Sequence, residues 1–120
     1  MAAHESKLLK VLRIGRDTSA RGEGISLKVA LARTKYKELR RSFAPHDLVP
    51  LIQAHPDVIE DWISYSENKR TSGGWYVLRD GGVGAMGDRE PQERFAFLAN
   101  AVAEYVVREL DFWVSTTARC

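Results

Sequence analysis

Hydrophobic and polar residues follow a helical period along most of this 120-residue chain and a strand-like period in one stretch. From residue 25 to 43, apolar side chains recur every three or four positions, which predicts one amphipathic helix. Leu27 and Leu31 fall on the opposite side of that helix. They favour a second covered surface there, against another element or a partner chain. The apolar stripe itself consists of Ile25, Val29, Ala32, Tyr36, Leu39 and Phe43.

Capping residues and prolines place three further helices. We expect them over residues 47–54, 56–66 and 91–113, with an aspartate at the start of the first and a proline at the start of each of the others. The short apolar run 8–14 fits a helix turn and a strand about equally well. We leave its type open and favour a strand.

Residues 66–84 change the pattern. Turn-forming residues over 68–74 lead into the aromatic and β-branched run 75–78, and Asp80 and two glycines follow. This order is typical of a strand and a tight turn. The sequence therefore predicts a single compact α+β domain, with four to five helices packed on a small antiparallel β-hairpin or sheet. We expect a frayed terminus over 1–7 and a flexible loop over 15–24.

Charge is divided unevenly between the two halves of the chain. Residues 1–45 hold 11 Lys and Arg against 4 Asp and Glu, whereas residues 46–120 hold 7 against 12. The net charges are therefore +7 and −5. We expect the two halves to attract each other, within one fold or between subunits. A single cysteine and the lack of a long apolar run favour a cytoplasmic protein, bacterial in style, that does not enter a membrane.

Nucleic-acid binding is an alternative that the basic residues raise. The order of three helices and a hairpin resembles that of a winged helix, but the third helix, 57–66, carries three carboxylates and no cation, which would repel phosphates. Binding that does not depend on base sequence would use Lys69 and Arg70 together with the basic residues of the 25–43 helix. These are Lys28, Arg33, Lys35, Lys37, Arg40 and Arg41.

The spacing of the reactive residues matches no motif for catalysis, metal binding or cofactor binding. The three histidines lack the spacing of a metal site, and residues 69–74 carry the cations, hydroxyls and glycines of an anion-binding loop without the strand and helix that should flank it. We expect no metal, no cofactor and no catalytic residue, and interpret 69–74 as a helix end followed by a glycine turn.

Glu109 is the position that most invites a functional interpretation. A helical period places it in the middle of the apolar face of the last helix, where a carboxylate holds its proton more tightly unless a cation or several donors meet it. If a ligand site exists, we expect it around this residue. The candidate residues are Glu109, Lys69, Arg70, Trp75, Tyr76 and Tyr105.

Three functional hypotheses result. The first is a small non-enzymatic binding or interaction protein, such as an adaptor, accessory or immunity-type factor, that acts as a homo-oligomer or on another protein. The second is a nucleic-acid-binding protein. The third is a small-molecule-binding domain or an enzyme with a pocket around Glu109, in which the carboxylate faces an enclosed cavity.

Overall fold

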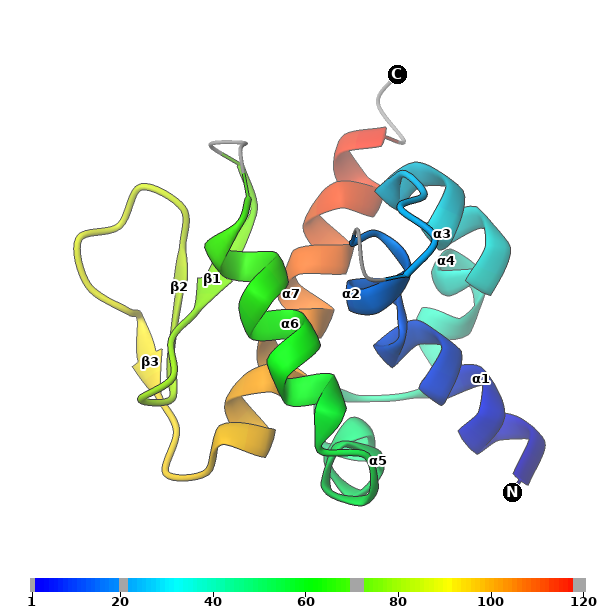
Figure 1. Ribbon diagram of the computed structural model, residues 1–120, viewed down its shortest axis with the longest axis horizontal. Coiled ribbons are helices and arrows are strands. Elements are labelled where there is room, and N and C mark those ends of the chain that lie inside the picture. Colours follow the sequence, from blue (N-terminus) through cyan, green and yellow to red (C-terminus); the bar gives the residue numbers. More distant parts are fainter. Residues whose placement is uncertain (1, 20–21, 70–72, 118–120) are drawn as a thin grey trace.

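Helix α7 (Leu98–Thr117) is the element on which the others pack. The computed structural model describes residues 2–19, 22–69 and 73–117. In Figure 1, α7 runs through the middle of the molecule, with the sheet on one side and the N-terminal helices on the other. Apolar residues fill nearly every turn of its first half, so most of its sides are covered, while Asn100, Glu104 and Arg108 mark the side that stays partly open. The fully or almost fully buried ones are Ala101, Val102, Ala103, Tyr105, Val106, Val107 and Leu110.

The fold class is confirmed: helices pack with a three-stranded antiparallel sheet in one α+β unit. The described residues form more helices than expected, because breaks in the helical backbone divide short helices from the longer ones. They are α1 (Ala2–Leu12), α2 (Ile14–Asp17), α3 (Leu27–Thr34), α4 (Tyr36–Leu39), α5 (Val49–Ala54), α6 (Asp57–Glu67) and α7, with 3-10 turns at Arg40–Ser42 and Pro45–Leu48.

The preference for a strand over residues 8–14 was wrong. This run lies mostly in α1, where Leu8, Val11 and Leu12 are buried at the three- and four-residue spacing of a helix. The segment 15–24 starts within α2 and continues as turns, while residues 20–21 lie outside the described part. The fraying of 1–7 and the flexibility of 15–24 stay predictions.

Lys35 divides the helix expected over 25–43. Its backbone is left-handed, with φ of 54°, and its N–H closes α3 by donating to Ala32 O at 3.2 Å. The break resets the helical phase, so the apolar stripe does not continue across it. Val29, expected inside, is 47% exposed, whereas Leu31 is 9% exposed and belongs to the core.

The expected hairpin is present as β1 (Trp75–Val77) and β2 (Gly82–Ala85), with Trp75 opposite Ala85 and Val77 opposite Val83. Gly81 makes the turn with φ of 93°, and its N–H donates to Leu78 O at 3.0 Å.

A third strand was not expected. β3 (Glu93–Arg94) pairs with β2, so α7 begins at Leu98 and not at Pro91. The pairing of this segment with β2 outweighs the proline's suitability for a helix start.

Ion pairs join the basic half of the chain to the acidic half. Arg13 contacts Asp57 at 2.5 Å, and Arg16 lies 3.2 Å from both Asp57 and the buried Asp61. These contacts hold the N-terminal helices on α6. None of the described helices has both the length and the apolar character needed to cross a membrane.

Candidate functional site

Glu109 lies in the interior, as its place on the apolar face of α7 implied. Its side chain is 0% exposed. Oε1 accepts hydrogen bonds from Lys69 Nζ and from the backbone N–H of Trp75, both at 2.8 Å. Oε2 accepts from the Tyr65 hydroxyl and from Trp113 Nε1, both at 2.9 Å. Two donors therefore meet each carboxylate oxygen.

Lys69 is the cation that balances this carboxylate, and its side chain is 5% exposed. Besides Glu109, its ammonium donates to Gly73 O and Trp75 O, each at 2.9 Å. An ammonium has three N–H donors, so all three are occupied by protein acceptors. We call Glu109 and its donors, Tyr65, Lys69, Trp75 N and Trp113, the Glu109 cluster.

The backbone at Gly74 is shaped to admit the ion pair. Its φ is 87°, and a Cβ there would stand 2.3 Å from Glu109 Oε1 and 2.7 Å from Lys69 Nζ. Glycine both adopts this left-handed conformation and leaves the volume that the two charged groups occupy. The turn that leads into β1 is thus fitted around the salt bridge.

Tyr65 in the cluster and Tyr105 beside it are held in their protonated form. Burial, followed by the charge of Glu109, raises the pKa of both Tyr65 and Tyr105. A negative tyrosinate next to the carboxylate would be repelled and poorly solvated.

The cluster is chemically suited to anchoring. A general base needs a lone pair that can reach a substrate proton, and the four donors already occupy the carboxylate of Glu109. The described residues contain no group of three or more His, Cys, Asp or Glu side chains that could hold a metal ion. The arrangement ties α6, the turn before β1 and the end of α7 together.

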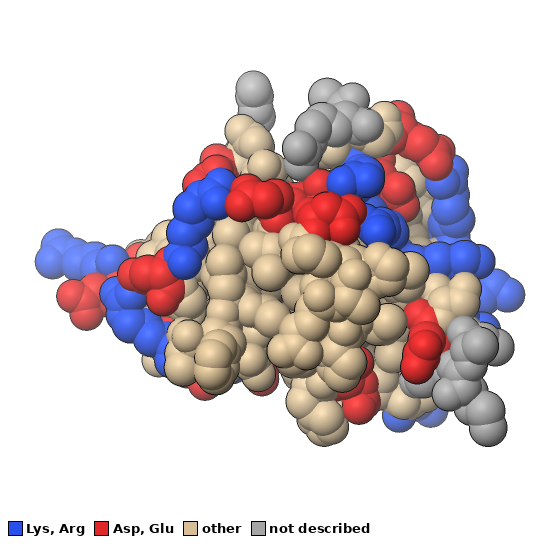
Figure 2. Space-filling model, turned by 60° about the horizontal axis from the view of Figure 1, so that its bottom comes forward, with Lys and Arg blue, Asp and Glu red and all other residues tan. Residues whose placement is uncertain are grey.

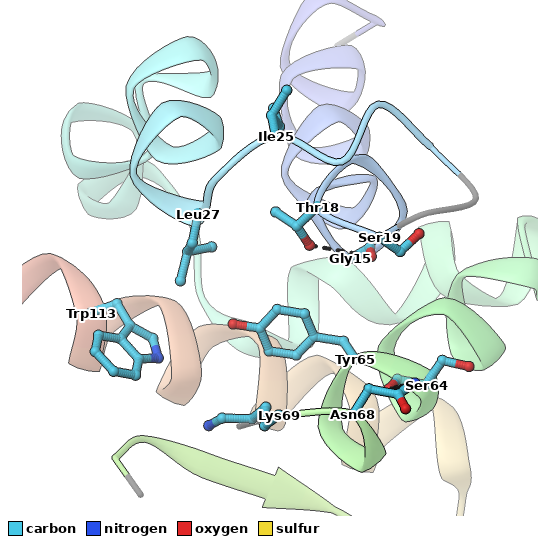
Figure 3. Close-up of a pocket in the computed structure, with 10 residues that line it drawn as sticks. All are labelled: Gly15, Thr18, Ser19, Ile25, Leu27, Ser64, Tyr65, Asn68, Lys69 and Trp113. Atoms are coloured by element: carbon cyan, nitrogen blue, oxygen red, sulfur yellow. Dashed lines mark hydrogen bonds between the residues drawn. The ribbon is translucent and has the colours of Figure 1, made fainter. Parts of the chain in front are cut away.

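A pocket of about 430 Å³ lies against one side of the cluster. Three donors of Glu109, namely Tyr65, Lys69 and Trp113, line it, whereas Glu109 itself does not. The carboxylate therefore does not face this cavity. The small-molecule hypothesis had supposed that it would. Figure 3 shows α2 and the segment before α3 on one side of this space and α6 and α7 on the other.

The other residues expected at the site are distributed around the cluster. Trp75 reaches Glu109 through its backbone, while its ring lies 5.2 Å from the guanidinium carbon of Arg108. Tyr76 lies against Gly84 of β2, and the Glu109 cluster does not include it. Tyr105 is buried beside the cluster, and Arg70 lies outside the described residues.

Leu27 and Leu31 separate in the structure. Leu27 is partly buried and lines the pocket, while Leu31 packs in the core. The role of the two leucines in an interface stays a prediction.

The basic residues of the second hypothesis do not form one helix face, because the chain turns at Lys35. Arg33 pairs with Glu23 at 3.0 Å, and Arg40 pairs with Asp111 at 3.0 Å. The other four basic residues of this region, which are exposed, are Lys28, Lys35, Lys37 and Arg41.

An uncharged face lies at a different place from the cluster. Residues 48–56 and 95–103 are the two longest runs of the chain without Asp, Glu, Lys or Arg. In Figure 1, α5 and the segment leading from β3 into α7 both lie at the bottom of the molecule. With this side turned forward, Figure 2 shows a continuous surface without charged side chains and with charges at its edges. We call the residues of 48–56 and 95–103 that reach the surface the uncharged face.

Phe97 is the most exposed large apolar residue of this face, at 72%. It directly precedes α7, and its carbonyl accepts the first helical hydrogen bonds, from Asn100 N at 3.1 Å and Ala101 N at 3.2 Å. The residue is therefore fixed by the helix start while its ring faces solvent.

The sequence-based candidates did not include Tyr65, Trp113 or Phe97. The four-residue spacing of Glu109 and Trp113 on one helix was the available signal for the indole contact. The two uncharged runs were the available signal for the face. No family model, curated protein or solved structure matches this chain.

Proposed function

We propose that this protein is a non-enzymatic interaction protein that docks through the uncharged face, and that its first partner is a second copy of itself. The observation that carries the proposal is Phe97, which is 72% exposed and lies in the run 95–103 that has no Asp, Glu, Lys or Arg. Large aromatic side chains in surfaces depleted of charge mark the centres of protein interfaces.

Self-association is favoured by the symmetry of a two-fold interface. In such an interface the same patch meets itself, so it must be self-complementary. A patch with net charge would place like charges opposite one another, whereas an uncharged apolar patch does not. A stable dimer covers roughly 800 Å² on each partner. That is about a tenth of the 7079 Å² that this chain exposes.

The chemistry of the Glu109 cluster supports a non-enzymatic role, since its carboxylate is committed to four protein donors. A chain with one cysteine forms no disulfide of its own, which fits a reducing compartment such as the cytoplasm. An adaptor or accessory factor of this size acts by presenting a surface.

Mass in solution tests the proposal. We expect sedimentation of the wild-type chain over rising concentration to reach twice the 13.5 kDa of one chain. Phe97→Glu should stay at the mass of one chain, because it would bury an unpaired carboxylate at the interface.

Val29→Glu is the matched control. Val29 is also an exposed apolar residue, at 47%, but it lies on α3 outside the uncharged face. This variant should associate as the wild type does. A wild-type chain that stays single at every concentration, or a Phe97→Glu chain that still doubles its mass, would contradict self-association through this face.

A further inference from the structure

The pocket beside the Glu109 cluster has the construction of a ligand site. Its volume of about 430 Å³ falls in the range of small-molecule pockets. We propose that it binds an uncharged, planar aromatic molecule that carries N–H or O–H donors. This site is separate from the uncharged face, and the inference does not depend on self-association.

The charge of the ligand follows from Lys69. Of the described residues that line the pocket, it is the only charged one. Its ammonium is neutralised by Glu109 and fully occupied by Glu109, Gly73 O and Trp75 O. Among the described lining residues, an anionic ligand would find no available cation, and a cationic ligand would find no available carboxylate. Moving either from water would leave its charge uncompensated.

The hydrogen-bonding character of the ligand follows from the direction of the protein's own bonds. Thr18 donates its hydroxyl to Ile14 O at 2.9 Å, and Ser19 donates to Arg16 O at 2.7 Å. Tyr65 donates to Glu109 at 2.9 Å. A hydroxyl that has given away its hydrogen still has lone pairs that accept.

Two further polar side chains give a hydrogen to the protein. Asn68 Nδ2 donates to Ser64 O and keeps its side-chain oxygen as an acceptor, while Trp113 Nε1, which is a donor only, donates to Glu109, both at 2.9 Å. The pocket therefore presents mainly acceptors. A ligand that fits it must supply the donors.

The shape of the ligand follows from the rings and branched side chains that line the space. Figure 3 shows Tyr65 and Trp113 on one side and Leu27 and Ile25 on the other. Both rings are held by their hydrogen bonds to Glu109, so they form a rigid aromatic surface. Flat aromatic molecules pack against such a surface by offset or edge contacts.

A panel of small probes tests the three properties together. Indole, phenol and benzamide are neutral, planar donors; N-methylindole, anisole and N,N-dimethylbenzamide are their partners without a donor; benzoate and benzylammonium carry charge. Titrations followed by two-dimensional NMR should shift the Trp113 indole N–H and the Asn68 signals with at least one neutral donor. Its donor-free partner should bind about tenfold more weakly, which is the effect of one hydrogen bond. The charged probes should bind more weakly still.

Variants locate the binding. Ile25→Trp should fill the pocket and abolish the shifts, while Val29→Trp, on the exposed side of α3, should leave them unchanged. If the spectrum of Ile25→Trp shows a disturbed fold, Ser19→Trp replaces it. Phe97→Glu should bind the probe as the wild type does.

Three results would overturn the proposal. One is the absence of binding by every neutral donor. The second is binding of benzoate or benzylammonium as tight as that of the neutral donors. The third is an unchanged response in a folded variant whose pocket is filled.

Discussion

Lys69 Nζ lies 2.8 Å from Glu109 Oε1, and both side chains are almost completely removed from solvent, at 5% and 0% exposure. The pair joins residues 40 positions apart in the sequence. It links the end of α6 to the second half of α7 and encloses the turn before β1. This contact and the donors around it therefore contribute to the stability of the hairpin on the helical core.

Removal of one member of the pair should be costly. Glu109→Gln leaves a buried ammonium without its counter-charge, and Lys69→Met leaves a buried carboxylate. Each should lower the free energy of unfolding by about 3–5 kcal/mol. Urea unfolding measures this change, and a double-mutant cycle with the Glu109→Gln/Lys69→Met chain gives the coupling between the two.

Glu104→Gln is the control on the same helix. Glu104 pairs with Arg108 at 3.3 Å but is 31% exposed, so its loss should change stability by no more than about 0.5 kcal/mol. An equal effect of Glu109→Gln and Glu104→Gln would show that burial of the Lys69 pair contributes nothing.

Alanine substitutions at two glycines distinguish the cost of a left-handed backbone from the cost of a steric clash with the Lys69–Glu109 pair. Gly74 and Gly87 have similar left-handed φ angles, 87° and 99°. A Cβ at Gly87 meets nothing within 4 Å, whereas one at Gly74 collides with Glu109. Gly87→Ala should cost roughly 1–2 kcal/mol, the cost of the left-handed backbone alone. Gly74→Ala should cost clearly more by the same measurement, and equal losses would refute the steric fit around the pair.

Stability should fall at alkaline pH. Burial raises the pKa of Tyr36, Tyr65 and Tyr105 in the folded state, with Asp111 or Glu109 adding to the effect. Above about pH 10, unfolded tyrosines release their protons while the folded ones retain them. The stabilisation is therefore complete below about pH 10 and is lost as the pH rises further.

Ultraviolet absorption of tyrosinate checks the alkaline behaviour. In the folded protein most of the signal should appear together with unfolding, at higher pH than in urea. Coincident titration curves in buffer and in urea would contradict the protected state of these hydroxyls.

Nucleic-acid binding should be weak and sensitive to salt. Arg33 and Arg40 are engaged with Glu23 and Asp111, which reduces the positive charge that phosphates would meet. We expect the chain to elute from a DNA column at a low salt concentration. Retention at physiological salt that is lost in a Lys28→Gln/Lys35→Gln/Lys37→Gln chain would favour the nucleic-acid hypothesis instead.

Much of the fold could be predicted because local patterns determined it. The hairpin follows from the strand-forming run before Asp80 and the glycine turn, and α6 from its proline and one apolar face. The break at Lys35 could not be predicted, since lysine has no preference for a left-handed backbone. Contacts made elsewhere impose it, among them the buried Tyr36 hydroxyl that donates to Asp111 at 2.7 Å.

Part of the candidate site could be predicted as well. The period of α7 identified Glu109 as a carboxylate in an apolar setting, and its proximity in space to Lys69 and Trp75 was expected. The identity of the other donors depends on how α6 crosses α7, which no local pattern encodes. Phe97 was missed because Pro91 suggested a helix start, and the pairing of β3 moves that start to Leu98.

The length of α7 sets the distance between the two proposed binding positions, at Phe97 and at Trp113. Phe97 immediately precedes the helix, and Trp113 lies 16 residues further on. At a rise of 1.5 Å per residue, the two positions are about 24 Å apart along the axis. A small molecule beside Trp113 and a protein on Phe97 would not compete for space. The chain can therefore bind both partners at once without a steric clash. In this ternary assembly, α7 is the rigid spacer between the small molecule and the protein.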